Sequence, residues 1–235
     1  MRINQYLAQT VGISRRAADK DIEAGLVRIG GKRAHLGDQV EADTEVAYKG
    51  KLLIQKKSPP VTIILNKPVG YVTSRKRDET NAPTVMDLLP PELQHLKPVG
   101  RLDKESDGLL ILTDDGDAIY QSTHPKFQTA KEYLVNFEHP LSDREIVAWK
   151  KGIKLSDGIA KADKIERVGR KFHITLHQGK NRQIRRMAGK SGNTVLALTR
   201  LAMGDITLGN LEAGKWKKLE TPKKKAKNPA PSSTR

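Results

Sequence analysis

Asp103 is the residue with the clearest potential for chemistry. It lies with Arg101 in a polar loop, and after Gly108 the chain continues as the apolar run Leu109–Leu112. Such a run is typical of a strand buried on both faces. A carboxylate held at the edge of a buried strand can act as a base or a nucleophile. The simpler alternative is a solvated acid on a surface turn, because turns are usually polar.

Tyr133 is a second candidate. Residues 130–137 alternate between polar and apolar side chains, which predicts a half-buried strand. The commoner role of a strand tyrosine is that of a core aromatic with a hydrogen-bonded hydroxyl.

Three arginines form the third candidate group. Residues 183–188 predict a helix whose apolar face is Ile184, Met187 and Ala188, after a turn at Gly179. The three arginines of this stretch would then point outward near the start of that helix. Backbone N–H groups at a helix start also attract anions. The alternative is an ordinary solvated basic face. The three are Arg182, Arg185 and Arg186.

The composition limits the possible functions. The 235 residues carry a net charge of +16 and include no cysteine. A chain this basic is expected to bind a polyanion, and nucleic acid is favoured over an anionic membrane surface. We expect neither a disulfide nor a thiolate or metal site. No apolar run approaches the roughly 20 residues of a spanning helix, and residues 1–9 lack a signal-peptide pattern, so we expect a cytoplasmic protein.

Composition also predicts the domain boundaries. Residues 1–48 predict two short helices and a hairpin, with Ser14 as the N-cap of the second helix. Residues 49–60 are rich in Lys, Gln, Ser and Pro, which predicts a linker. A larger domain is expected over 61–220, where the Pro-rich piece before Asp103 should hold only one short helix. The lysine-rich residues 221–235 predict a disordered tail.

Four separated motifs, taken together, resemble those of pseudouridine synthases, in the branch that modifies rRNA of both ribosomal subunits. They are Lys67-Pro68-Val69-Gly70, Gly100-Arg101-Leu102-Asp103, Lys131-Glu132-Tyr133 and Gln178-Gly179-Lys180-Asn181-Arg182-Gln183-Ile184-Arg185-Arg186-Met187. The first 46 residues resemble the S4 RNA-binding module through Ser14-Arg15-Arg16 and Gly31-Lys32, although Gly30 stands where that module usually has Asn.

The resemblance implies roles for individual residues. Asp103 would be the essential catalytic residue, Arg185 would pair with it and keep it ionised, and Tyr133 would stack on the target base. Residues expected to support the site from below are Lys67, Pro68 and Leu176. Residues expected to contact RNA are Arg101, Leu102, Lys104, Arg182, Gln183, Ile184, Arg186, Ser14, Arg15, Arg16 and Lys32.

The implied activity is isomerisation of uridine to pseudouridine in RNA. The base must leave its stack to be reached, and the reaction has no redox change, so we expect no cofactor and no metal. Asp103 has three possible roles: attack at C1′, attack at C6, or removal of a ribose proton. The motifs look most like the type F subgroup, which acts on 23S rRNA and on a tRNA anticodon.

The expected protein is therefore a monomeric α+β enzyme. An S4-like module would precede a catalytic domain built on a mixed, mostly antiparallel sheet with flanking helices. The alternative is a non-catalytic RNA-binding or ribosome-assembly factor that uses the module and the basic tail.

Overall fold

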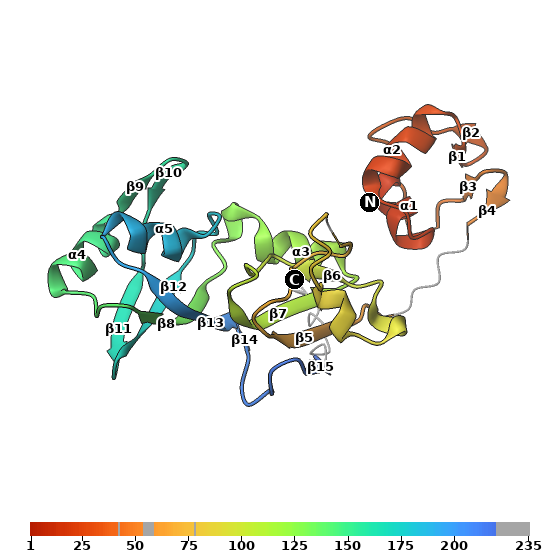
Figure 1. The fold of residues 1–235 in the computed structure, drawn as a ribbon. Coiled ribbons are helices and arrows are strands. Elements are labelled where there is room, and N and C mark those ends of the chain that lie inside the picture. The colour runs from red at the N-terminus through yellow and green to blue at the C-terminus, as the bar shows by residue number, and fades with distance from the viewer. Residues whose placement is uncertain (42, 54–58, 78, 220–235) are drawn as a thin grey trace, which may run out of the picture. The chain divides into compact units, whose positions relative to one another are not determined.

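The computed structural model describes the chain except for residues 42, 54–58, 78 and 220–235. It divides into two compact units, residues 1–59 and residues 60–235 (Figure 1). The tail expected over 221–235 lies outside the described residues. None of the helices in the described ranges is long and apolar enough to cross a membrane.

The first unit packs two helices against a small antiparallel sheet with the strand order β2-β1-β3-β4. Its core joins apolar side chains of both helices to the first strand, including Leu7, Ile22 and Val27. Ser14 caps the second helix as predicted, because its Oγ accepts a hydrogen bond from the N–H of Ala17. The elements are α1 (Ile3–Thr10), α2 (Arg15–Glu23), β1 (Val27–Ile29), β2 (Lys32–Arg33), β3 (Val46–Tyr48) and β4 (Lys51–Leu52).

The second unit is built on one large sheet. Its nine strands among the described residues are β5 (Thr62–Lys67), β6 (Lys97–Val99), β7 (Asp107–Thr113), β8 (Lys131–Phe137), β11 (Lys164–Val168), β12 (Lys171–Leu176), β13 (Val195–Met203), β14 (Ile206–Thr207) and β15 (Trp216–Lys218). The order is β11-β12-β8-β13-β7-β5-β15, with β14 on β13 and β6 on β7. Only β13 and β7 pair in parallel among these described strands, so the predicted mixed, mostly antiparallel α+β fold is confirmed.

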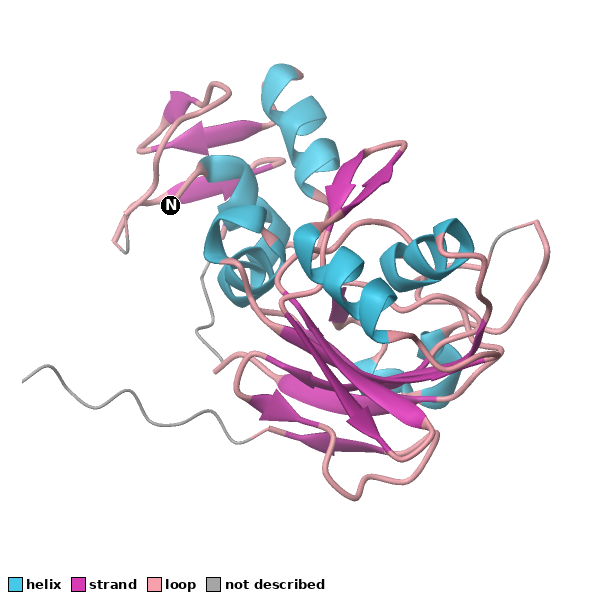
Figure 2. Cartoon of the chain, turned by 90° about the vertical axis from the view of Figure 1, so that its left-hand side faces the viewer, coloured by secondary structure: helices cyan, strands magenta, loops and turns pink. Residues whose placement is uncertain are grey.

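Helices and a separate hairpin flank the sheet (Figure 2). Figure 1 shows α4 and α5 beside β8, β11 and β12, and α3 near the other half of the sheet. The helices are α3 (Gly116–Thr123), α4 (Asp143–Lys151) and α5 (Gln183–Lys190), the 3₁₀ helices are η1 (Val85–Leu88), η2 (Pro91–Leu93) and η3 (Pro125–Phe127), and the hairpin is β9 (Ile153–Leu155) with β10 (Gly158–Ala160).

The core of this unit follows the two halves of the sheet. One cluster joins β8, β12, α4 and α5 around the fully buried Trp149. Another joins β5 and β7 to η1 and η2. Tyr133 packs against both clusters. Its strand, β8, therefore lies where the two halves meet, and β13 runs beside it between the halves.

Three local predictions differ from the structure. The Pro-rich piece before Asp103 holds two 3₁₀ helices and strand β6, where one short helix was expected. Pro98 fits β6 because that strand pairs on one side only, with β7. The hairpin β9–β10 was not predicted. Strand β4 lies within the stretch expected as a linker, because Leu53 next to it packs on the core of the first unit.

Candidate active site

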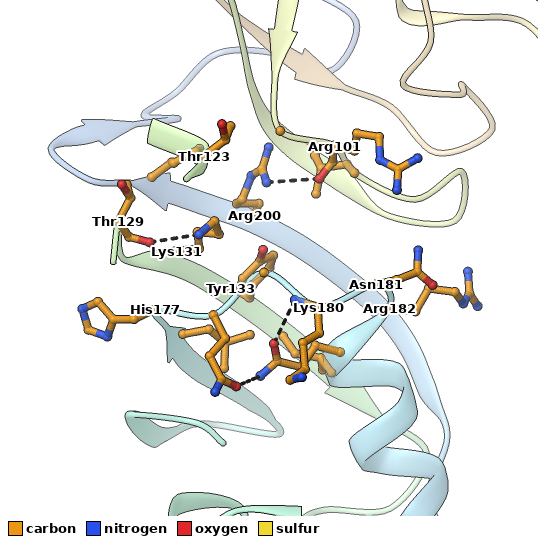
Figure 3. Close-up of a pocket in the computed structure, with 18 of the residues that line it drawn as sticks. Arg101, Thr123, Thr129, Lys131, Tyr133, His177, Lys180, Asn181, Arg182 and Arg200 are labelled. Atoms are coloured by element: carbon orange, nitrogen blue, oxygen red, sulfur yellow. Dashed lines mark hydrogen bonds between the residues drawn. The ribbon is translucent and has the colours of Figure 1, made fainter. Parts of the chain in front are cut away.

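A cavity of about 790 Å³ lies where the loop before β7 faces β8 and the start of α5. Asp103 lines it from the loop, Tyr133 from β8, Leu176 from the end of β12 and Arg182 from the residue before α5. Tyr133 stands in the middle of the labelled side chains, with Lys131 and Arg200 to one side and Arg182 to the other (Figure 3). The sequence-predicted candidates Asp103 and Tyr133 thus share one cavity large enough for a small ligand.

Asp103 is accessible from this cavity but is not fully solvated. Its side chain is 27% exposed, and Nη1 of Arg182 lies 4.0 Å from its Oδ2. The same Nη1 donates a 2.7 Å hydrogen bond to Oε2 of Glu105. That hydrogen bond holds the pKa of the Glu105 carboxyl below its usual value and raises the pKa of Arg182. Arg182 therefore places a positive charge beside the Asp103 carboxyl.

The loop that carries Asp103 is held in place by hydrogen bonds to its backbone carbonyls. Three of these carbonyls accept hydrogen bonds from side chains of other elements. In β5, Lys67 Nζ donates to O of Ser106 (2.6 Å), and in the loop after β5, Thr73 Oγ1 donates to O of Leu102 (2.7 Å). In β13, Arg200 Nη1 donates to O of Arg101 (3.3 Å).

The three carbonyls in between are also bound. The N–H of Ser106 donates to O of Asp103, the N–H of Gly70 to O of Lys104, and Nη2 of Arg185 to O of Glu105 at 2.9 Å. Six consecutive carbonyls, from Arg101 to Ser106, therefore have donors. Such a loop holds its carboxylate in a fixed position, and positioning of this kind is a requirement of catalysis.

Arg185 differs from its expected role. Among the ion pairs of the described residues, the cation facing Asp103 is Arg182. Arg185 instead donates to O of Glu105, to Oγ of Ser106 (3.2 Å) and to O of Val195 (3.1 Å). Burial lowers the pKa of its guanidinium. The reason is geometric: in α5 the side chain of Arg185 is directed beneath the loop, so it supports Asp103 through the backbone.

The other residues expected at α5 lie in different surroundings. Gln183 and Ile184 are buried in the cavity wall, and Gln183 Nε2 donates to the side chain of Gln178 and to O of Lys161. Arg186 forms a two-point contact with Asp157, at 3.0 and 2.9 Å, away from Asp103. The main-chain φ of 47° at Arg182 places it outside the helix and beside the cavity.

The remaining predicted residues are distributed between the units. Leu102 lines the cavity and belongs to the core, and Arg101 lines it while exposed. Lys104 is exposed on the same loop. Pro68 follows Lys67 beneath that loop. The first-unit residues, which are exposed, are Ser14, Arg15, Arg16 and Lys32.

Sequence reasoning missed two residues that hold the site, Thr73 and Arg200. Both are buried polar side chains. Thr73 binds both the carbonyl and the N–H of Leu102, and Arg200 binds O of Leu109 as well as O of Arg101. The signal for Arg200 was available, since an arginine within the apolar strand 195–203 needs internal acceptors.

Lys67 gives the second unit a predicted pH dependence. Its side chain is fully buried, and burial lowers its pKa from 10.5 to about 8. Between these values the unfolded chain binds more protons than the folded chain, so the free energy of unfolding rises with pH. Below about pH 8 the buried Lys67 is charged, and this charge destabilises the folded state by its full amount. From pH 8 to 10.5 the folded chain loses the proton and the free energy of unfolding rises by roughly 3 kcal/mol.

Urea unfolding from pH 7 to 10.5 measures this effect, with Lys67→Met as the reference. The wild type should gain roughly 3 kcal/mol relative to the variant over that range. Parallel pH profiles for the two proteins would show that Lys67 keeps its usual pKa in the folded state.

Comparison with known proteins identifies the family of both units. Residues 61–190 match the model of the RNA pseudouridylate synthase family, and residues 1–46 match the S4 domain. An uncharacterized RNA pseudouridine synthase of Aquifex aeolicus is 36% identical over 93% of this chain and 90% of its own length.

Two further relatives and one solved structure agree. The dual-specificity RNA pseudouridine synthase RluF of Salmonella typhi is 36% identical over 93% of this chain and 75% of its own. The ribosomal small subunit pseudouridine synthase A of Yersinia pestis is 33% identical over 94% and 95%. A crystal structure of a pseudouridylate synthase superposes with a TM-score of 0.67 at 30% identity, covering 94% of this chain and 96% of that one. These matches, which cover both units, show that the chain belongs to the RNA pseudouridylate synthase family.

Proposed function

We propose that this protein isomerises one uridine of rRNA to pseudouridine, acting as a monomer in the cytoplasm with 23S rRNA as its substrate and a tRNA as a second one. The observation that carries the proposal is Asp103, which lies beside Arg182 on the wall of a cavity of about 790 Å³, in a loop whose carbonyls from Arg101 to Ser106 all accept hydrogen bonds. The relatives named for RluF and for the small ribosomal subunit support rRNA as the substrate class.

The reaction requires three changes in the substrate. The bond between C1′ and N1 breaks, the uracil turns, and C1′ bonds to C5 while the C5 proton leaves and N1 takes up a proton. An anionic Asp103 can serve as nucleophile toward C1′ or C6, or as base toward a ribose proton, and in each case Arg182 is the cation that faces it. The ring of Tyr133, in the middle of the cavity, offers a stacking surface to the extruded base and offsets part of the unstacking cost.

Release of tritium from C5 tests this function. Transcripts of 23S rRNA, 16S rRNA and tRNA are labelled at uridine C5 and incubated with the protein in the presence of a chelator. Release from 23S rRNA supports the proposed substrate. Release from 16S rRNA alone would mean that the substrate is 16S rRNA and not 23S rRNA. Tight RNA binding without release from any of the three would favour a non-catalytic assembly factor.

The S4 domain is expected to supply affinity and not chemistry. Arg15 and Arg16 are exposed at the start of α2, where their charges oppose the helix dipole. The variant Arg15→Gln/Arg16→Gln should raise the KM for rRNA and leave kcat unchanged. The slope of the logarithm of its binding constant against the logarithm of salt concentration should become shallower by about 0.7 to 0.9 for each phosphate contact that is lost.

Binding isotherms at several salt concentrations, together with steady-state kinetics, measure both effects. Lys51→Gln is the matched control, because Lys51 is an exposed cation of the same unit that lies on another element, β4. An equal change in both variants would mean that the first unit attracts RNA only through its net charge.

A further inference from the structure

Two exposed aromatic side chains meet beside the cavity. The sequence contains ten Phe, Tyr and Trp residues, and all ten lie within the described ranges. Of these ten, only Tyr120 and Phe127 are exposed, at 46% and 43%. Their ring centroids lie 5.7 Å apart in an edge-to-face arrangement. Both rings belong to the adjoining elements α3 and η3, so this segment presents the two exposed aromatics as one cluster.

A histidine and a lysine complete this cluster. The ring of His124 lies 4.8 Å from that of Tyr120 and 6.4 Å from that of Phe127. Nζ of Lys126 lies 5.2 Å from the Tyr120 centroid and 4.7 Å from the Phe127 centroid. We call Tyr120, His124, Lys126 and Phe127 the aromatic platform. Aromatic rings combined with a cation are the side chains that stack unpaired bases and attract their phosphates.

The platform is continuous with the active-site cavity. His124 and Pro125 line the cavity that Asp103 and Tyr133 also line. The rings of Tyr120 and Phe127 do not line it but lie beside the ring of His124 in the segment α3–η3. An RNA strand that delivers a uridine to Asp103 must therefore leave the cavity past some part of its rim, and the platform occupies one such part.

His124 caps η3 by accepting a hydrogen bond from the N–H of Lys126, but Tyr120 and Phe127 belong to none of the core clusters of the described residues. None of the residues of α3 is buried. A neighbouring core cluster joins β5, β6, β7 and β13. The residue of α3 that packs against this cluster is Ile119, not Tyr120. Apolar rings left in water at the cavity rim cost free energy unless a partner covers them. RNA is the expected partner, because the family of this protein acts on RNA.

We propose that the aromatic platform stacks an unpaired RNA base that flanks the extruded uridine, while Lys126 attracts the phosphate next to it. The proposal rests on the proposed function for the identity of the extruded base, but the stacking itself is a binding event. It extends the RNA-contacting surface beyond the catalytic loop and α5 to α3 and η3. Because every base has a stacking face, this contact adds affinity with little sequence preference.

Equilibrium binding can test the platform without relying on turnover. The full-length Asp103→Ala protein is titrated against a fluorescein-labelled RNA of one uridine between two runs of five adenosines, at several salt concentrations. Tyr120→Ala or Phe127→Ala in that background should weaken binding about 5- to 150-fold, the effect of losing one stacked base. The salt-dependence slope should stay unchanged, because no charge is removed.

Three matched variants separate stacking from other effects. Tyr120→Phe keeps the ring and should bind as tightly as its parent. Lys126→Met should reduce the salt-dependence slope by about 0.7, the value for one phosphate contact of a single strand. Val168→Ala removes another exposed apolar side chain, on the edge strand β11, and should leave binding unchanged.

Unchanged affinity in both alanine variants would overturn the proposal. So would a loss that Val168→Ala shares, or a loss that comes with a smaller salt slope and vanishes at high salt. Because the measurement uses a catalytically inactive background, it gives its answer even if pseudouridine formation fails, which the tritium assay reports separately.

Discussion

Replacing Asp103 by Asn is expected to lower the rate of uridine isomerisation by about 10⁴-fold or more, the range seen when a nucleophile or base is removed. Asn keeps the size and hydrogen-bonding capacity of the side chain but cannot act as an anionic nucleophile or base. Single-turnover pseudouridine formation measures the rate, because it excludes product release. RNA affinity should remain that of the wild type.

Glu105→Gln is the matched control for this prediction. Glu105 is the other acid that contacts Arg182, yet it does not line the cavity. Its pair with Arg182 is exposed on both sides, at 55% and 42%, so its loss should cost about 1 kcal/mol at most, roughly fivefold in rate. Equal losses in the two variants would mean that the negative charge of the loop matters and the position of Asp103 does not.

Gly108→Ala is expected to produce the largest loss of stability among single-methyl additions near the site. Gly108 has a φ of +99°, and a Cβ there would lie 2.4 Å from O and 2.7 Å from N of Arg200. These are main-chain atoms of β13, which pairs with β7 in parallel at this point, so no side chain can turn aside. Backbone strain of about 1–2 kcal/mol and overpacking of about 1–3 kcal/mol add to a loss of about 2–5 kcal/mol.

Urea unfolding of the full chain at one pH measures this loss. Gly116→Ala is the control, since Gly116 opens α3, has no positive φ, and would place an added Cβ with no neighbouring atom within 4 Å. That variant should unfold within about 0.5 kcal/mol of the wild type. If Gly108→Ala were equally stable, β7 and β13 would not approach as closely as the structure shows.

The sequence predicted the architecture well where apolar patterns are strong. The apolar run at Leu109–Leu112 became the central part of β7, and the alternation over 130–137 became β8 with Tyr133 facing the cavity. Ser14 was identified as a helix cap because hydroxyl side chains satisfy the free N–H groups of a first turn. Patterns of this kind are local, so they can be read along the chain.

The predictions that failed depend on contacts distant in sequence. Strand β6 has only three residues, one of them Pro98, and it forms because β7 offers it a partner. Arg185 was expected to pair with Asp103 on the strength of its motif; the ion-pair contact to Asp103 comes from Arg182, Arg185 binds O of Glu105, and the catalytic role of Arg185 stays a prediction. The support from Thr73 and Arg200 comes from 29 and 99 positions away along the chain, a separation that spacing rules do not cover.

Direct mapping of the product shows most closely whether Asp103 catalyses formation of pseudouridine in rRNA. Purified 23S rRNA transcript is incubated with the wild type or with Asp103→Asn, treated with carbodiimide to tag pseudouridine, and read by reverse transcription. We expect a new stop at one uridine with the wild type and none with the variant. A stop that Asp103→Asn produces equally fast would contradict the assignment of Asp103 as the catalytic residue.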